Sequence, residues 1–93
     1  ASGTGYVMTA NVTGSASNVT LLAANAARRC AMIFNDSTAS CYVKFGATAS
    51  ATSFTVKMGP ASYFEGPVEL YGTGIIDGIW TSATGSARVT EVV

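Results

Sequence analysis

The sequence has 93 residues, of which 48% are hydrophobic and only 11% are charged, which excludes disorder driven by composition and predicts one domain with one core. Five basic and five acidic residues give a formal net charge of zero. A neutral chain has no long-range field that would attract nucleic acid or an anionic membrane, so neither is expected as a partner.

Ten Ser, twelve Thr and ten Gly supply an uncharged polar surface and frequent turn signals. Such a composition favours short strands over helices. We therefore predict an all-β fold, a compact antiparallel β-sandwich or barrel with an N-terminal arm and at most one short helical turn. Residues 1–18 are expected to form the arm and the first strand, and residues 19–93 the sandwich domain. No run approaches the roughly 18 apolar residues that span a bilayer, so we expect the chain to be soluble when expressed alone.

The first predicted strand covers residues 6–12, behind a glycine-containing tail at residues 1–5. Its backbone groups could pair with the sheet edge of a neighbouring chain, so we interpret this segment as an arm. Residues 21–27, LLAANAA, have high helix propensity within an otherwise β-rich sequence. This segment predicts a helical turn or an irregular loop.

Residues 30–34 and 41–45 flank the turn-forming run NDSTAS and predict a β-hairpin. A four-residue loop at 36–39 would place the larger side chains of both strands on one inward face and Lys44 in water. The side chains expected inside are Cys30, Met32, Phe34, Cys41, Val43 and Phe45.

The two cysteines lie near opposite ends of this predicted hairpin. Four residues at about 3.3 Å each separate them by more than the Cα distance of about 7 Å that a disulfide tolerates. We therefore predict two free, buried thiols. With no His and no third Cys in the chain, a zinc site is excluded, and neither a metal nor a cofactor is expected.

Residues 53–58 alternate apolar and polar side chains and predict a strand with one solvated face. Pro67 predicts an edge or a corner, and residues 68–71 predict a further short strand. Residues 74–81 and 87–92 predict a second hairpin across a loop rich in Ser and Gly. Within it, Gly78 is expected at a bulge or at a close-packing point.

Catalytic side chains are sparse, and we predict that the protein is not an enzyme. A hydrolytic triad needs a general base, yet the chain has no His and both its lysines lie at strand positions predicted to face solvent. Asp36 and Asp77 are expected at turns, where Asp is common. Trp80 is expected in the core in preference to a binding surface.

Four runs resemble small structural proteins of tailed bacteriophages, in particular capsid decoration (cement) or head-fibre modules. They are LLAANAARR at residues 21–29, IFNDSTA at 33–39, YVKFG at 42–46 and GIW at 78–80. The likeness covers residues 20–93 and implies a virion structural protein on the capsid surface, bound to the assembled head. Its implied partners are the major capsid protein or another virion protein, together with further copies of itself in a homo-oligomer.

A receptor- or carbohydrate-binding module of a phage tail fibre or baseplate is the alternative function. Such a module needs exposed aromatic and polar groups that converge on one groove. The short chain favours capsid decoration, because tail modules usually belong to longer proteins. For either function, the candidate interface residues come from the arm, a dibasic pair and an aromatic pair: Tyr6, Val7, Met8, Val12, Arg28, Arg29, Tyr63 and Phe64.

Overall fold

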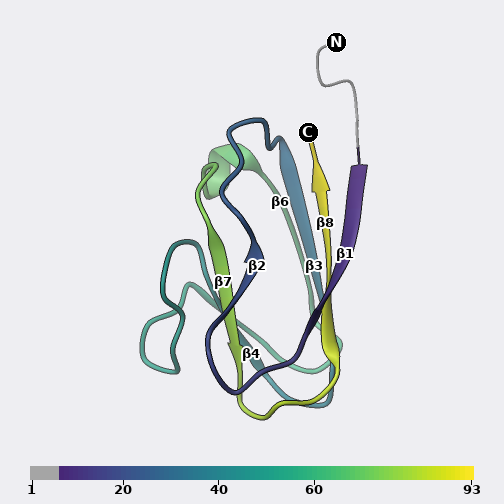
Figure 1. Ribbon diagram of the computed structural model, residues 1–93, viewed down its shortest axis with the longest axis vertical. Coiled ribbons are helices and arrows are strands. Elements are labelled where there is room, and N and C mark those ends of the chain that lie inside the picture. Colours follow the sequence, from purple (N-terminus) through teal and green to yellow (C-terminus); the bar gives the residue numbers. More distant parts are fainter. Residues whose placement is uncertain (1–6) are drawn as a thin grey trace.

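The structure, a computed structural model, describes residues 7–93 as two four-stranded antiparallel sheets packed into a sandwich (Figure 1). Sheet A has the strand order β1-β8-β3-β6, and sheet B has the order β2-β7-β4-β5. This arrangement confirms the predicted all-β fold with one short helical turn. The elements are β1 (Val7–Thr13), β2 (Val19–Leu22), β3 (Cys30–Asp36), β4 (Cys41–Lys44), β5 (Val56–Met58), β6 (Tyr63–Pro67), the 3-10 helix η1 (Val68–Leu70), β7 (Ile76–Trp80) and β8 (Ser86–Val92).

The predicted hairpin of β3 with β4 is wrong. β3 pairs with β6 and β8 in sheet A, whereas β4 pairs with β5 and β7 in sheet B. Residues 37–40 therefore form an arch from one sheet to the other, and Ala39 is buried within it. β7 and β8 are divided between the sheets in the same way, so residues 81–85 form a second arch where a hairpin was predicted. The same turn-forming residues suit both connections, and only the long-range partners of each strand distinguish them.

The inward face of β3 is the opposite of the predicted one. Ala31, Ile33 and Asn35 are buried, whereas the larger side chains that alternate with them are only half-buried. Both faces of this strand are apolar over residues 30–34, so the hydrophobic pattern alone does not choose between them. The choice follows from Asn35, whose amide finds hydrogen-bond partners only between the sheets.

The core lies between the two sheets, and the prediction that Trp80 belongs to it is confirmed. Gly78 is the predicted close-packing point, because a Cβ atom there would lie 2.9 Å from Leu21 Cδ1. The buried apolar residues of the core are Leu21, Ala31, Ile33, Ala39, Cys41, Val43, Met58, Ile76, Trp80, Ala87 and Val89.

Three segments differ from their predicted secondary structure. Val19–Leu22 is a strand and not a helical turn, because it pairs with β7; the irregular loop begins after it. Val68–Leu70 is a 3-10 helix where a strand was predicted. The strand predicted over residues 53–58 is confined to Val56–Met58. Pro67 does lie on an edge strand, because β6 is the last strand of sheet A.

Candidate functional site

The outer face of sheet A is formed by the residues that alternate with the buried ones on its strands. On β3, for example, Cys30, Met32 and Phe34 alternate with the buried Ala31 and Ile33. Among the residues whose side chains the structure describes, none on this face is buried, so no other element covers it. This uncovered face of four strands is available for binding. It carries Thr9, Asn11, Thr13, Cys30, Met32, Phe34, Asp36, Tyr63, Glu65, Pro67, Ser86, Arg88, Thr90 and Val92.

Apolar side chains are concentrated on the β3–β6 side of this face. The pairing register puts Phe34 opposite Tyr63, and Cys30 between Pro67 and Val92. Tyr63 is 56% exposed, although its hydroxyl donates a 2.9 Å hydrogen bond to Glu65 Oε1, which raises the pKa of Tyr63. We call this group the apolar strip. Its members are Cys30, Met32, Phe34, Tyr63, Pro67 and Val92.

In the described part of the chain, the outer face carries one ion pair and one further carboxylate, Glu65, which accepts the hydrogen bond from the Tyr63 hydroxyl. Arg88 donates from Nε and Nη2 to Asp36 Oδ2 at 3.0 and 2.8 Å, and both side chains are 48% exposed. This ion pair links the end of β3 to β8, next to the apolar strip. Low charge around a cluster of aromatic and Met side chains is typical of the centre of a protein–protein interface.

Arg28 is buried and Phe64 is half-buried against the core, so neither is presented on the outer face of sheet A, and the interface role predicted for Arg28 is corrected. The Arg28 side chain is buried, with Nε 2.8 Å from Glu91 Oε2 and its other nitrogens bound to backbone carbonyls of Ala23, Gly72 and Gly74. The acidic partner comes from β8, 63 positions away, and sequence reasoning did not foresee it.

Phe64 points inward because β6 pairs it with the buried Ile33. Its ring lies 5.3 Å from Phe45 and 6.0 Å from Tyr71, measured between centroids. Of the predicted aromatic pair, only Tyr63 is therefore presented on the outer face of sheet A. Arg29 is exposed just before β3, and its backbone N–H donates to Val92 O.

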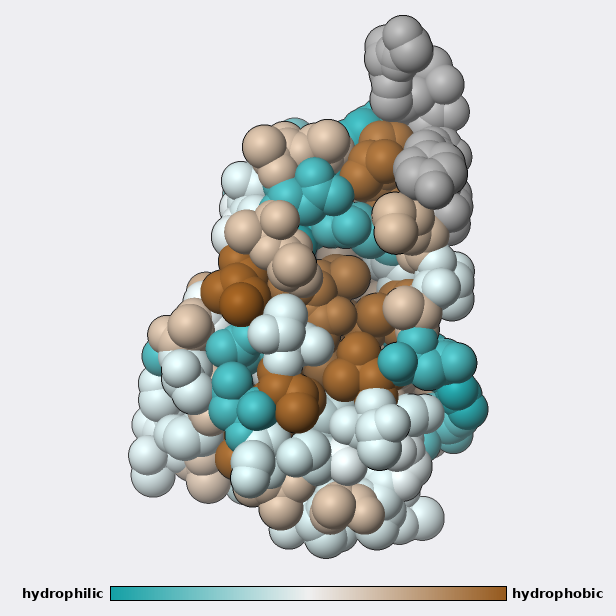
Figure 2. Space-filling view, in the orientation of Figure 1, coloured by the Kyte–Doolittle hydropathy of each residue, from teal (hydrophilic) through white to brown (hydrophobic). Residues whose placement is uncertain are grey.

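The predicted arm enters the sandwich at β1, which pairs with β8 over seven residues. Val7 is the first residue of this strand, and Tyr6 lies outside the described residues. Met8 and Val12 lie on the inward side of β1, with Met8 50% exposed and Val12 packed against the core. Figure 2 shows apolar side chains gathered in a hollow on this side of the molecule. β1 is thus part of sheet A.

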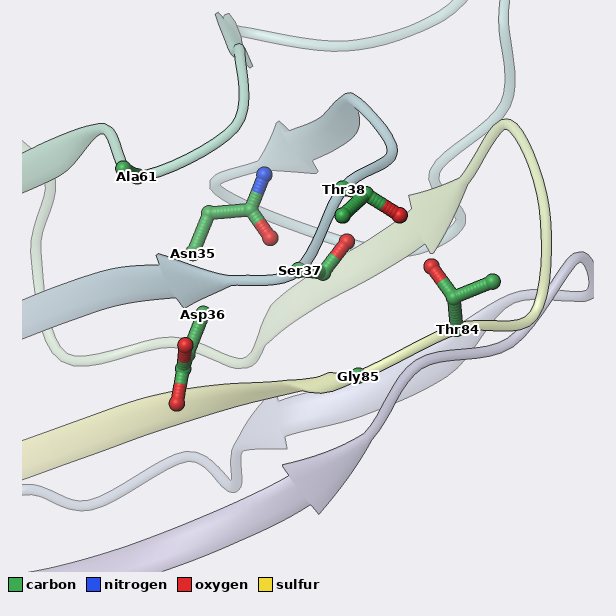
Figure 3. A pocket seen from close by; sticks show the side chains of 7 residues that line it. All are labelled: Asn35, Asp36, Ser37, Thr38, Ala61, Thr84 and Gly85. Atoms are coloured by element: carbon green, nitrogen blue, oxygen red, sulfur yellow. The ribbon is translucent and has the colours of Figure 1, made fainter.

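A pocket of about 300 Å³ lies where the two arches meet at one end of the sandwich. The Asn35 amide and the Ser37 hydroxyl are already engaged by backbone groups of the protein. In Figure 3 the Asp36 carboxylate points away from the hydroxyl-bearing side chains of Thr38 and Thr84. No aromatic side chain lines the pocket, so it offers no ring on which a sugar could stack. Its lining residues are Asn35, Asp36, Ser37, Thr38, Ala61, Thr84 and Gly85.

Asp77 is a buried strand residue and does not occupy the predicted turn. It lies in β7, where Asn18 Nδ2 donates to its Oδ2 at 3.2 Å and its Oδ1 has no hydrogen-bond partner. Within residues 7–93, no group of three or more His, Cys, Asp or Glu side chains is arranged to hold a metal ion. In the same residues, no helix has the length and apolar character needed to cross a membrane.

Comparison of the chain with protein families, with curated proteins and with solved structures finds no match. The resemblance to phage head proteins therefore depends on the four sequence runs alone.

Proposed function

We propose that this domain is a non-enzymatic structural module that binds the assembled head of a tailed phage through the outer face of sheet A. The observation that carries the proposal is the apolar strip, in which half-buried Met32 and Phe34 adjoin the exposed Tyr63 on an uncovered sheet. Contiguous apolar side chains on a folded domain mark interaction surfaces. The assembled head is the binding partner that the sequence resemblance favours.

The chemistry of the strip suits a protein surface better than an ionic ligand. Aromatic and Met side chains provide large contact areas and are enriched at the centres of interfaces. The neighbouring Arg88 and Asp36 neutralise each other, so Glu65 is the carboxylate of this face whose desolvation a binding partner would have to compensate. A module that binds only the assembled head stabilises that assembly by mass action.

Glycan binding in the pocket between the arches is the second candidate, because the pocket is large enough for a sugar ring and carries hydroxyl groups. Two observations weigh against it. The polar side-chain atoms of Asn35 and Ser37 already form hydrogen bonds with backbone groups, and the lining has no aromatic ring. Thr38 and Thr84 would remain as the hydroxyl donors.

Binding to heads purified from phage that lack this protein tests the proposal. Co-sedimentation would be measured for the unchanged protein, for Tyr63→Ser and for Met32→Lys. Loss of a central interface residue costs about 2 kcal/mol, which corresponds to roughly 30-fold weaker binding. We expect a weakening of this size for both variants, with unfolding midpoints close to that of the unchanged protein.

Phe54→Ser is the matched control. Phe54 is 41% exposed and its ring lies 4.7 Å from Tyr42 of sheet B, away from the apolar strip. This variant is expected to bind heads as the unchanged protein does. Equal binding by all variants would exclude the outer face of sheet A as the docking surface. Binding to host-surface glycans without binding to heads, abolished by Thr38→Ala, would favour the second candidate.

A further inference from the structure

Within residues 7–93, no strand pairs with one of the two backbone edges of β1. Its seven residues pair with β8 in an unbroken register, and in the described part of the chain β8 is the only strand that pairs with it. The N–H and C=O groups along the other edge can therefore accept a further strand.

The other three edge strands carry features that prevent such pairing, and β1 carries none of them. β6 contains Pro67 and Glu65, and β5 has only three residues, including Lys57. β2 has four residues and a register shift between Thr20 and Leu22. Proline, charge, short length and irregularity are the usual protections of sheet edges. The β1 sequence VMTANVT has no charge, no proline and no bulge.

β1 also extends beyond the cover of sheet B. Met8 lies opposite Glu91 and Ala10 opposite Val89, and both of these β8 residues are buried. Met8 and Ala10 lie on the same side of sheet A as Glu91 and Val89, yet both are exposed, because sheet B does not cover this part of β1. The hollow in Figure 2 lies beside this strand. A neighbouring strand in sheet A would cover part of this apolar surface.

We propose that β1 pairs antiparallel with β1 of a second copy of this chain, about a two-fold axis at Ala10. Residues 8–12 of the strand are self-complementary about that residue. Met8 then lies opposite Val12 of the second copy on the inward side, and Thr9 lies opposite Asn11 on the outward side. Over residues 8–12, apolar residues meet apolar ones and polar residues meet polar ones, and no like charges face each other anywhere along the strand.

This pairing joins the two copies of sheet A into one continuous eight-stranded sheet. An antiparallel pair of seven-residue strands exchanges about six to eight backbone hydrogen bonds, which fix the register. The interface is isologous, so it closes after two copies and does not propagate. The inference does not depend on binding to a phage head, because it concerns the free protein in solution.

Charge placed on the two-fold axis tests the dimer. Analytical ultracentrifugation of the unchanged protein is expected to show a concentration-dependent dimer. Ala10→Lys and Ala10→Glu each put like charges opposite one another, so each should weaken dimerisation at least about tenfold. An equimolar mixture of the two variants should restore a dimer. Thr20→Lys, an exposed position on the edge strand β2, is the matched control and should dimerise normally.

An introduced thiol tests the register. Residues directly opposite in an antiparallel pair have Cα atoms about 4.5–5.5 Å apart, within the range that a disulfide spans. In a Cys30→Ala background, Ala10→Cys should form a covalent dimer on mild oxidation, and Thr20→Cys should not. The proposal would be overturned if the protein stayed monomeric at high concentration. It would also be overturned by a dimer that neither Ala10 charge weakens and that the introduced thiol does not crosslink. The free edge of β1 would then be available only to a different chain.

Discussion

The indole of Trp80 and the amide of Asn35 are joined by a buried hydrogen bond, with Trp80 Nε1 donating to Asn35 Oδ1 at 3.1 Å. The same amide nitrogen lies 2.9 Å from Ala39 O, 3.1 Å from Met58 O and 3.0 Å from Gly59 O. One side chain of sheet A thus contacts the first arch, the end of β5 and β7, one of the two central strands of sheet B. This contact orients β3 and connects the two sheets.

Asn35→Ala is expected to lower the free energy of unfolding by about 3 kcal/mol or more, because it removes several buried hydrogen bonds and leaves their partners unpaired. Urea denaturation followed by Trp80 fluorescence measures the change. Thr20→Ala is the control, since Thr20 is exposed on β2, away from sheet A. A loss below about 1 kcal/mol in Asn35→Ala would contradict the central role given to this amide.

Arg28→Met is expected to destabilise the fold by about 3–5 kcal/mol, because it leaves the buried Glu91 carboxylate without its cationic partner and with only the Asn25 amide as a hydrogen-bond donor. Replacing both residues, Arg28→Met with Glu91→Leu, should recover most of the loss. Arg88→Met removes the half-exposed ion pair to Asp36 and should cost no more than about 1 kcal/mol. Similar losses for the two single Arg variants, in chemical denaturation, would mean that the Arg28 pair is not shielded from water.

Gly85→Ala is expected to be severely destabilising. The residue has a φ of 61°, and an added Cβ atom would approach Asp36 O and Ser37 Cα, both backbone atoms, at 2.4 and 2.7 Å. The two arches would have to separate to admit it. At Gly74 a Cβ atom meets nothing within 4 Å, so Gly74→Ala should be tolerated. Thermal unfolding of the two variants provides the comparison, and equal midpoints would be inconsistent with the contact between the arches.

Cys30 and Cys41 should differ in reactivity. Burial raises the pKa of Cys41 to about 12, against a smaller opposing effect of a backbone hydrogen bond from Ile79. Near pH 8 its reactive thiolate is therefore scarce, whereas Cys30 is half-buried on the outer face of sheet A. Mass spectrometry after iodoacetamide treatment should show one label in the native protein.

Unfolding in denaturant without reductant should then permit two labels, because both thiols are free. The Cys30→Ser variant should remain unlabelled in its native state. Two labels on the native protein would contradict the burial of Cys41.

Local sequence patterns were sufficient for the fold class and for most strands. Alternation over residues 86–92 and apolar runs at 30–34 and 41–45 each produce a strand, because β-branched and aromatic side chains favour extended backbone. Pro67 marks an edge because it cannot donate a backbone hydrogen bond. Both thiols are free, as predicted, but the prediction was made from a hairpin that does not exist, because the cysteines lie in different sheets. Cys41 is buried as predicted, whereas Cys30 is only half-buried.

Tertiary structure decided which sheet each strand joins and which of its faces is inside. Turn-forming residues specify that the chain reverses direction, and both a hairpin and an arch reverse it. Which sheet the second strand joins therefore depends on pairing partners that are distant in the sequence. Arg28 is buried only because Glu91 neutralises it, and Asn35 is inside only because Trp80 and three carbonyl oxygens satisfy its amide. Burial of a polar side chain is favourable only when such partners are in place, and they come from residues far along the chain. The apolar strip depends on the same contacts. Because side chains alternate along a strand, Met32 and Phe34 must face outward once Asn35 faces inward.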